Sequence, residues 1–149
     1  MKPTPSCWVK FGAISTGLEM ALRKFLAVRD PRLALHGEQS FDALVIGDVV
    51  GETPFTDYAS LGSLIGQFNK LVPDQRRIDP KLVDLRDALA HGRVWSLDGN
   101  FPLRLLKFDK PSNGTVRVTW ATTLTEEWLH EQRDLVLDAM IRAHGRRPR

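Results

Sequence analysis

The stretch DPKLVDLRDALAHG, residues 79–92, contains a helix start, an apolar stripe and a helix stop. Asp79 suits the N-cap because its carboxylate accepts hydrogen bonds from unpaired backbone amides, and Pro80 suits the first helical position, where no amide donor is missed. Gly92 is expected to end the helix in the left-handed conformation. The apolar stripe between these signals consists of Leu82, Val83, Leu85 and Leu89.

Two more helices are predicted upstream. The first has Glu19, Arg23 and Lys24 off its apolar stripe and should end near Asp30, because Pro31 cannot continue the hydrogen-bond ladder. Its apolar positions are Phe11, Ile14, Leu18, Ala21, Leu22 and Phe25. The second helix carries Leu61, Leu64, Ile65, Phe68 and Leu71 at helical spacing and stops at Pro73.

Residues 31–56 show no clear period, and we expect a long connection with a helical turn starting at Ser40. Downstream, the period changes to two on either side of residues 110–114, which predicts a β-hairpin with Asn113 and Gly114 in its turn. The expected inward face of the hairpin consists of Leu106, Phe108, Val116, Val118 and Trp120.

A final helix is predicted to start after Thr125 as N-cap, with Glu126 and Glu127 in its first turn and Leu124 against Leu129 as a hydrophobic staple. Its expected buried stripe is Trp128, Leu135, Val136, Ala139 and Met140. The predicted fold is therefore mainly α: an up-and-down bundle of about four to five helices with one β-hairpin inserted before the last helix. We expect residues 1–149 to form a single domain, with residues 142–149 as a flexible basic tail.

The composition limits the functional classes. Of 149 residues, 42% are hydrophobic, which is enough to fill the core of one domain. The net charge is +3, but the last eight residues hold four arginines and no acid, so the rest of the chain is close to neutral. One cysteine and four scattered histidines predict no disulfide and no metal site. With no apolar run long enough for a membrane span, we expect a cytoplasmic protein.

One group of residues has catalytic potential: Arg86, Asp87 and His91, at the end of the helix predicted over residues 80–91. Asp87 and His91 are four residues apart, so the carboxylate is expected to orient the imidazole, which then acts as a base. Arg86 offers a permanent cation with a planar fork of donors for a phosphate. Because Arg86 and His91 lie about 140° apart around a helix, we expect two copies of this helix end to face each other in a dimer.

The motif LRDALAHG at a helix end, in a small helical chain with a hairpin before the last helix, resembles the HEPN superfamily. The resemblance implies that Arg86 and His91 are the catalytic pair and that Asp87 is the polar neighbour of the arginine. Where some HEPN toxins carry a tyrosine two residues after the histidine, this chain has Arg93.

The resemblance further implies a homodimeric endoribonuclease that needs neither metal nor cofactor, acts on RNA in toxin–antitoxin or anti-phage defence, and has an antitoxin or effector protein as partner. The alternatives are a catalytically silent HEPN-like dimerisation or binding module and, third, a DNA-binding regulator. Residue by residue, His91 with Gly92 also fits a plain helix terminus, Arg86 a surface ion pair and Asp87 a solvated carboxylate.

Other residues are secondary candidates for substrate binding. Arg93 lies close enough to the motif to touch a substrate, and Arg76 with Arg77 forms either a phosphate grip or a solvated basic turn. Three tryptophans offer rings for base stacking, but their spacing favours the core. They are Trp95, Trp120 and Trp128.

Overall fold

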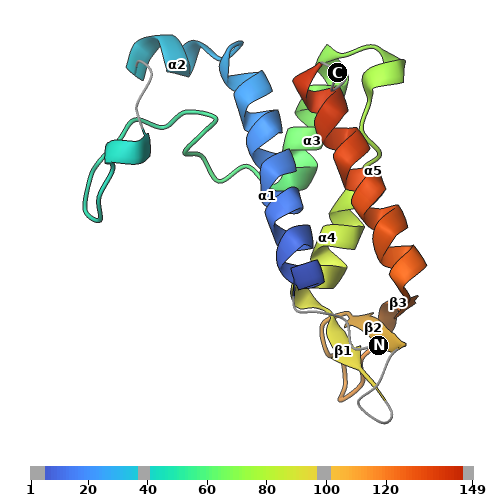
Figure 1. Ribbon diagram of the computed structural model, residues 1–149. Coiled ribbons are helices and arrows are strands. Elements are labelled where there is room, and N and C mark those ends of the chain that lie inside the picture. Colours follow the sequence, from blue (N-terminus) through green and yellow to red (C-terminus); the bar gives the residue numbers. More distant parts are fainter. Residues whose placement is uncertain (1–5, 37–40, 97–101, 146–149) are drawn as a thin grey trace. The chain divides into compact units, whose positions relative to one another are not determined.

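The computed structural model describes residues 6–36, 41–96 and 102–145, and among them the side chains of residues 16–33, 42–96 and 102–145. The described part is mainly helical, as predicted, and carries a small antiparallel sheet (Figure 1). Its helices are α1 (Ser6–Ala27), α2 (Pro31–His36), α3 (Leu61–Leu71), α4 (Lys81–His91) and α5 (Glu126–His144), with 3-10 turns η1 (Phe41–Ala43) and η2 (Asp74–Arg76). Its strands are β1 (Arg93–Trp95), β2 (Leu103–Phe108) and β3 (Val118–Leu124).

The chain divides into two compact units. Unit 1 consists of Met1–Ser15 and Asp79–Asp138 and contains α4, the sheet and most of α5. Unit 2 consists of Thr16–Ile78 and Ala139–Arg149 and contains α2, α3 and both 3-10 turns. Because α1 and α5 each cross the boundary, both units include parts of these two helices.

The core of unit 2 lies along α1 and α3. The Phe25 ring meets the Phe68 ring edge-on at a centroid distance of 4.7 Å, and the predicted stripes of both helices are largely buried. Leu71 is an exception: it is exposed, and Val72 is buried in its place. The backbone becomes extended at Val72, with φ −122° and ψ 153°. The helical spacing therefore no longer predicts which side chain is buried at this position, and Val72, not Leu71, is the last core residue of this segment. Phe11 and Ile14 lie outside the described side chains.

The structure corrects two expectations for the N-terminal half. Within the predicted connection, Pro31 begins α2, where a proline is tolerated because the first helical amides have no helical acceptor. Arg23 was expected to face solvent, but it is only 7% exposed. The predicted turn at Ser40 falls on a residue outside the described ones, and η1 begins at Phe41.

Arg23 is buried because every part of its guanidinium has an acceptor. It donates to Glu19 Oε1 from Nε and Nη2, to Asp57 Oδ1 and the Pro54 carbonyl from Nη1, and to the Ala59 carbonyl from Nη2. Arg32 joins the same network through Asp57 Oδ2 at 3.1 Å. The network ties the segment before α3 to α1, although the sequence separation is more than 30 residues.

Unit 1 contains a three-stranded sheet in the order β1-β2-β3, with both pairs antiparallel. The predicted hairpin corresponds to β2 and β3, and Asn113 and Gly114 both have positive φ in its turn, as expected. The third strand, β1, was not predicted. It starts at Arg93, directly after Gly92, so that α4 leads into the sheet without a loop.

The inward face of the sheet also differs from the prediction. Leu105 and Leu124 are buried with Ala88 of α4, whereas Val116 and Val118 are exposed. In β2, whose sequence is LRLLKF, leucines fall on both faces of the strand, so the alternation of apolar and polar residues does not indicate which face is buried. An irregularity in the ladder at Lys107/Phe108 pairs Lys107 with Trp120 but Phe108 with Val118, which places Trp120 and Val118 on opposite faces.

The last helix begins as predicted. The Thr125 hydroxyl accepts from the Trp128 amide at 3.1 Å, and both staple residues, Leu124 and Leu129, are buried. Val136 and Ala139 are buried as expected, but Leu135 is 45% exposed. The predicted tail starts at Arg142, whereas α5 continues to His144. No helix in the described part of the chain is long and apolar enough to cross a membrane.

Candidate functional site

The candidate site occupies the last two turns of α4 in unit 1. Arg86 and Asp87 form an ion pair, with 2.8 Å between Arg86 Nη1 and Asp87 Oδ1. Both side chains are about one-third exposed, at 36% and 33%. A guanidinium has five N–H donors, and Asp87 accepts from Nη1 alone. Nε and Nη2 of Arg86 bond to none of the described residues and can therefore donate to a second anion such as a phosphate.

His91 is the last residue of α4 and is exposed. Its ring makes no hydrogen bond to any residue of the described chain, and the expected bond from Asp87 is not formed. A helical side chain four residues away is within reach, but the guanidinium next to Asp87 in the sequence competes for the same carboxylate and carries a permanent charge. Asp87 therefore positions Arg86 and does not orient His91.

Gly92 connects this helix end to the sheet, and its role differs from the prediction. Its φ of −71° is not left-handed, and its amide donates to the Ala88 carbonyl at 2.7 Å. A Cβ at this position would overlap the Ala88 carbonyl oxygen and lie 2.6 Å from Leu105 Cδ1. Glycine is required because β2 packs directly against the end of α4, not because of an unusual backbone angle.

Arg93 follows as the first residue of β1, paired with Leu106, and is exposed. It makes no ion pair or side-chain hydrogen bond within the described residues. Its place two residues after His91 keeps it a candidate for contacting a substrate.

Arg76 and Arg77 belong to unit 2 and are already engaged there. Arg76 Nη2 donates to the Arg142 carbonyl at 2.8 Å, and its guanidinium lies 5.8 Å and 5.9 Å from the ring centroids of Phe25 and Phe68. Arg77 pairs with Asp74 at 2.9 Å. In return, Arg142 donates to the carbonyls of Gln75 and Arg77 at 3.1 Å each. These hydrogen bonds in both directions hold η2 against the end of α5. Arg76 and Arg77 therefore both have structural contacts that account for their positions.

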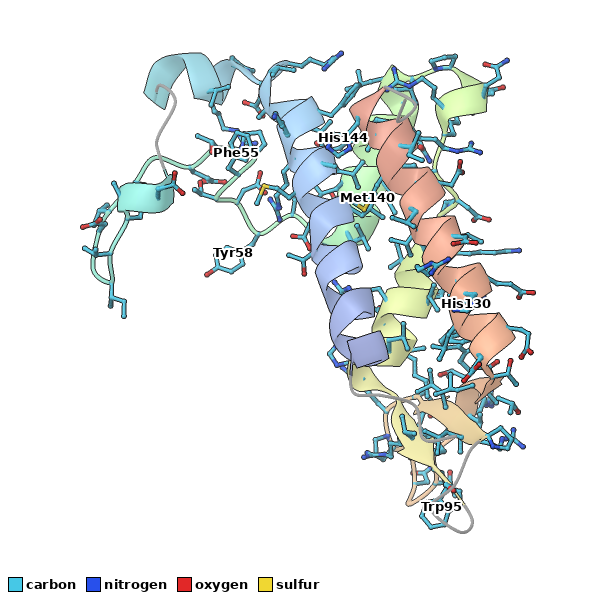
Figure 2. All side chains as sticks on the ribbon, viewed as in Figure 1. Phe55, Tyr58, Trp95, His130, Met140 and His144 are labelled. Carbon is cyan, nitrogen blue, oxygen red and sulfur yellow. The ribbon has the colours of Figure 1, made fainter. Side chains whose placement is uncertain are left out.

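The three tryptophans separate into two groups. Trp120 and Trp128 pack beside the cluster of Ala88, Leu105 and Leu124, with ring centroids 6.4 Å apart, as expected for core residues. Trp95 is 64% exposed at the end of β1, which contradicts the expectation that it lies in the core (Figure 2). A three-residue edge strand offers too little neighbouring structure to cover an indole ring.

Unit 1 also contains a pocket of about 490 Å³ between α4, β2, β3 and α5. Its lining combines apolar side chains with carboxylates and ammonium groups, and it includes none of the predicted site residues. The residues are Asp79, Lys81, Leu82, Asp84, Leu85, Lys107, Thr119, Trp120, Gln132 and Leu135. In the described part of the chain, no three His, Cys, Asp or Glu side chains gather to hold a metal ion.

Comparison with known proteins finds no matching family model, no matching curated protein and no matching solved structure.

Proposed function

We propose that this chain is an endoribonuclease of HEPN type that acts as a homodimer without a metal ion, with Arg86, Asp87 and His91 at its active site. The observation that supports the proposal is the state of His91: an exposed imidazole with no hydrogen-bond partner among the described residues, one turn beyond a partly exposed Arg86–Asp87 pair. Such a ring is free to exchange protons with a bound substrate.

In the proposed reaction, His91 removes the proton from an RNA 2′-hydroxyl, and the resulting oxygen attacks the adjacent phosphorus. Nε and Nη2 of Arg86 donate to the phosphate oxygens as negative charge develops on them. The partner subunit's His91 protonates the 5′-oxygen as it leaves. The products are a 2′,3′-cyclic phosphate and a 5′-hydroxyl.

The direction of the two side chains supports the proposed dimer. Arg86 and His91 are separated by about 140° around the axis and by about 7.5 Å along it, so one helix end presents them in different directions. Two copies facing each other across a two-fold axis bring the arginine of one near the histidine of the other.

The test is cleavage of single-stranded RNA in EDTA. His91→Ala is expected to lower the rate about 10²- to 10⁴-fold, the usual contribution of general acid–base catalysis, while His130→Ala, an exposed histidine on α5, leaves it unchanged. Arg86→Ala has a matched control in Arg133→Ala, because Arg133 pairs with its neighbour Asp134 at the same 2.8 Å. Equal rates for the parent protein and His91→Ala would refute the proposal.

A catalytically silent dimerisation module is the second candidate, and one observation favours it. Asp87 binds Arg86, so no carboxylate of the described residues orients His91. A parent protein that is dimeric by analytical ultracentrifugation, cleaves no RNA and stays dimeric as His91→Ala would support this alternative.

A further inference from the structure

The register of the sheet assigns each residue to one of two faces, because directly opposed residues in antiparallel strands share a face. Leu103, Leu105, Trp120 and Leu124 share the face that packs against Ala88 and Trp128. Arg93 is opposite Leu106, Trp95 is opposite Arg104, and Phe108 is opposite Val118. These residues share the other face, and we call Arg93, Trp95, Arg104, Leu106 and Phe108 the open sheet face.

The open sheet face is accessible and includes aromatic rings. Arg93, Trp95 and Arg104 are exposed, and Leu106 and Phe108 are half-buried. Figure 2 shows Trp95 on β1, away from α4 and α5. Trp95 and Arg104 are direct cross-strand neighbours, so their Cβ atoms are about 5 Å apart.

The charge of this face has one sign. It carries two arginines and no carboxylate, and neither guanidinium makes an ion pair or hydrogen bond within the described residues. Elsewhere in the described chain, Arg23, Arg32, Arg77, Arg86 and Arg133 all pair with carboxylates. Unpaired arginines beside an exposed indole match a ligand that is anionic and has flat rings.

We propose that the open sheet face binds single-stranded nucleic acid, with bases stacking on Trp95 and Phe108 and with Arg93 and Arg104 contacting phosphates. A base in a duplex is already stacked and paired, so an exposed ring of this kind selects unpaired bases. Because β1 begins two residues after His91, a strand held on this face is bound beside the proposed catalytic helix end. The choice of RNA as the strand rests on the proposed function, whereas the binding itself does not.

The test measures binding of a fluorescein-labelled 12-nucleotide uridine oligomer by anisotropy, in the His91→Ala background so that the oligomer stays intact. Trp95→Ala is expected to raise Kd about 5- to 100-fold, the usual effect of removing one stacking partner, and Trp95→Phe to restore most of the affinity. The logarithm of the association constant is expected to fall linearly with the logarithm of the salt concentration. Replacing Arg93 and Arg104 by Ala should make this slope shallower by about 0.7 for each phosphate that the variant no longer neutralises. Arg133→Ala is the matched arginine control and should change neither quantity.

A blunt duplex of mixed sequence is expected to bind more weakly than the uridine oligomer, and a thymidine oligomer to bind comparably if base and phosphate alone are recognised. Unchanged Kd in Trp95→Ala, or equal affinity for the duplex, would overturn the inference. So would a change of oligomeric state in Trp95→Ala with no change in Kd, which would make this face a protein interface.

The two proposals fail separately. RNA binding that depends on Trp95, together with a parent protein that cleaves nothing, would refute the proposed function alone. Cleavage that depends on His91, together with a binding affinity that does not change in Trp95→Ala, would refute only the proposal that the open sheet face binds nucleic acid.

Discussion

Arg23 in unit 2 and the two arginines of the open sheet face in unit 1 show two opposite uses of the same side chain. Arg23 donates five hydrogen bonds and is 7% exposed. Arg93 and Arg104 are exposed, and their guanidinium groups donate no hydrogen bond to any described residue. A guanidinium that is buried with all its nitrogens bonded stabilises a fold, whereas one that is exposed and unpaired is available to an anion. The number of arginines or the net charge does not distinguish these cases.

The largest expected effect comes from breaking the network in unit 2. Asp57→Ala removes a carboxylate that accepts from Arg23 and Arg32, and leaves a buried guanidinium without its long-range counter-charge. We expect a loss of about 3–5 kcal/mol in the free energy of unfolding, measured by urea denaturation. The control Asp134→Ala removes an exposed pair and should cost at most about 1 kcal/mol. Equal destabilisation by the two changes would contradict a structural role for the buried network.

A smaller effect is expected at the junction in unit 1. Gly92→Ala adds a Cβ where the Ala88 carbonyl and Leu105 leave no room, so we expect a loss of about 1–3 kcal/mol in the free energy of unfolding and, under the proposed function, slower RNA cleavage. Gly66→Ala is the matched control, because beyond its chain neighbours and the adjoining backbone of α3 the added Cβ has no atom within 4 Å. There we expect a gain of about 0.5–1 kcal/mol from helix propensity. Unfolding curves and cleavage rates measure both, and a neutral Gly92→Ala would show that α4 and β2 are not in close contact.

The smallest effect is the pH dependence of stability. Burial acts to raise the pKa of Asp57, but hydrogen bonds from the Ala59 amide, Arg23 and Arg32 outweigh it and hold the pKa below 3.8. The side-chain hydrogen bond from Arg32 likewise lowers the pKa of Asp30. Because these pKa values are lower in the folded state, the stabilisation is present above pH 3.8 and is lost as the pH falls through the folded-state values. Thermal unfolding between about pH 6 and pH 2 measures this loss, and Asp57→Asn should flatten the profile. If the pH profile of stability is the same in Asp57→Asn as in the parent protein, Asp57 does not contribute to the loss of stability in acid.

Local patterns predicted the elements that depend on neighbouring residues. The helical spacing of Leu61, Leu64, Ile65 and Phe68 places α3 correctly, and the Asp79 carboxylate accepts from the Lys81 amide at 2.9 Å, one residue from the predicted start. The cap at Thr125 and the turn at Asn113 and Gly114 follow the same logic. These signals work because a cap, a stripe or a tight turn is decided within a few residues.

The candidate site was predicted less completely. The sequence placed Arg86, Asp87 and His91 at a helix end, where the structure also has them, but the partner of Asp87 depended on side-chain competition and is Arg86. Trp95 was expected in the core from its spacing, and the strand that carries it was missed. That strand, β1, has three residues and pairs with residues about ten positions away, so it leaves no period of its own to detect. Periodicity also did not reveal that Arg23 is buried, since its acceptors are more than 30 residues away.

By itself, the sequence determined a mainly helical chain, the extent of α3, both ends of α4 to within one residue, the start of α5, and an Arg–Asp–His group at one helix end, because each rests on contacts between near neighbours. Only the tertiary structure decided which face of the sheet is covered, which arginines are paired within the fold and why residue 92 is glycine. Those features depend on pairing and packing between distant segments, and a slip of one residue in the ladder changes the face of every side chain beyond it.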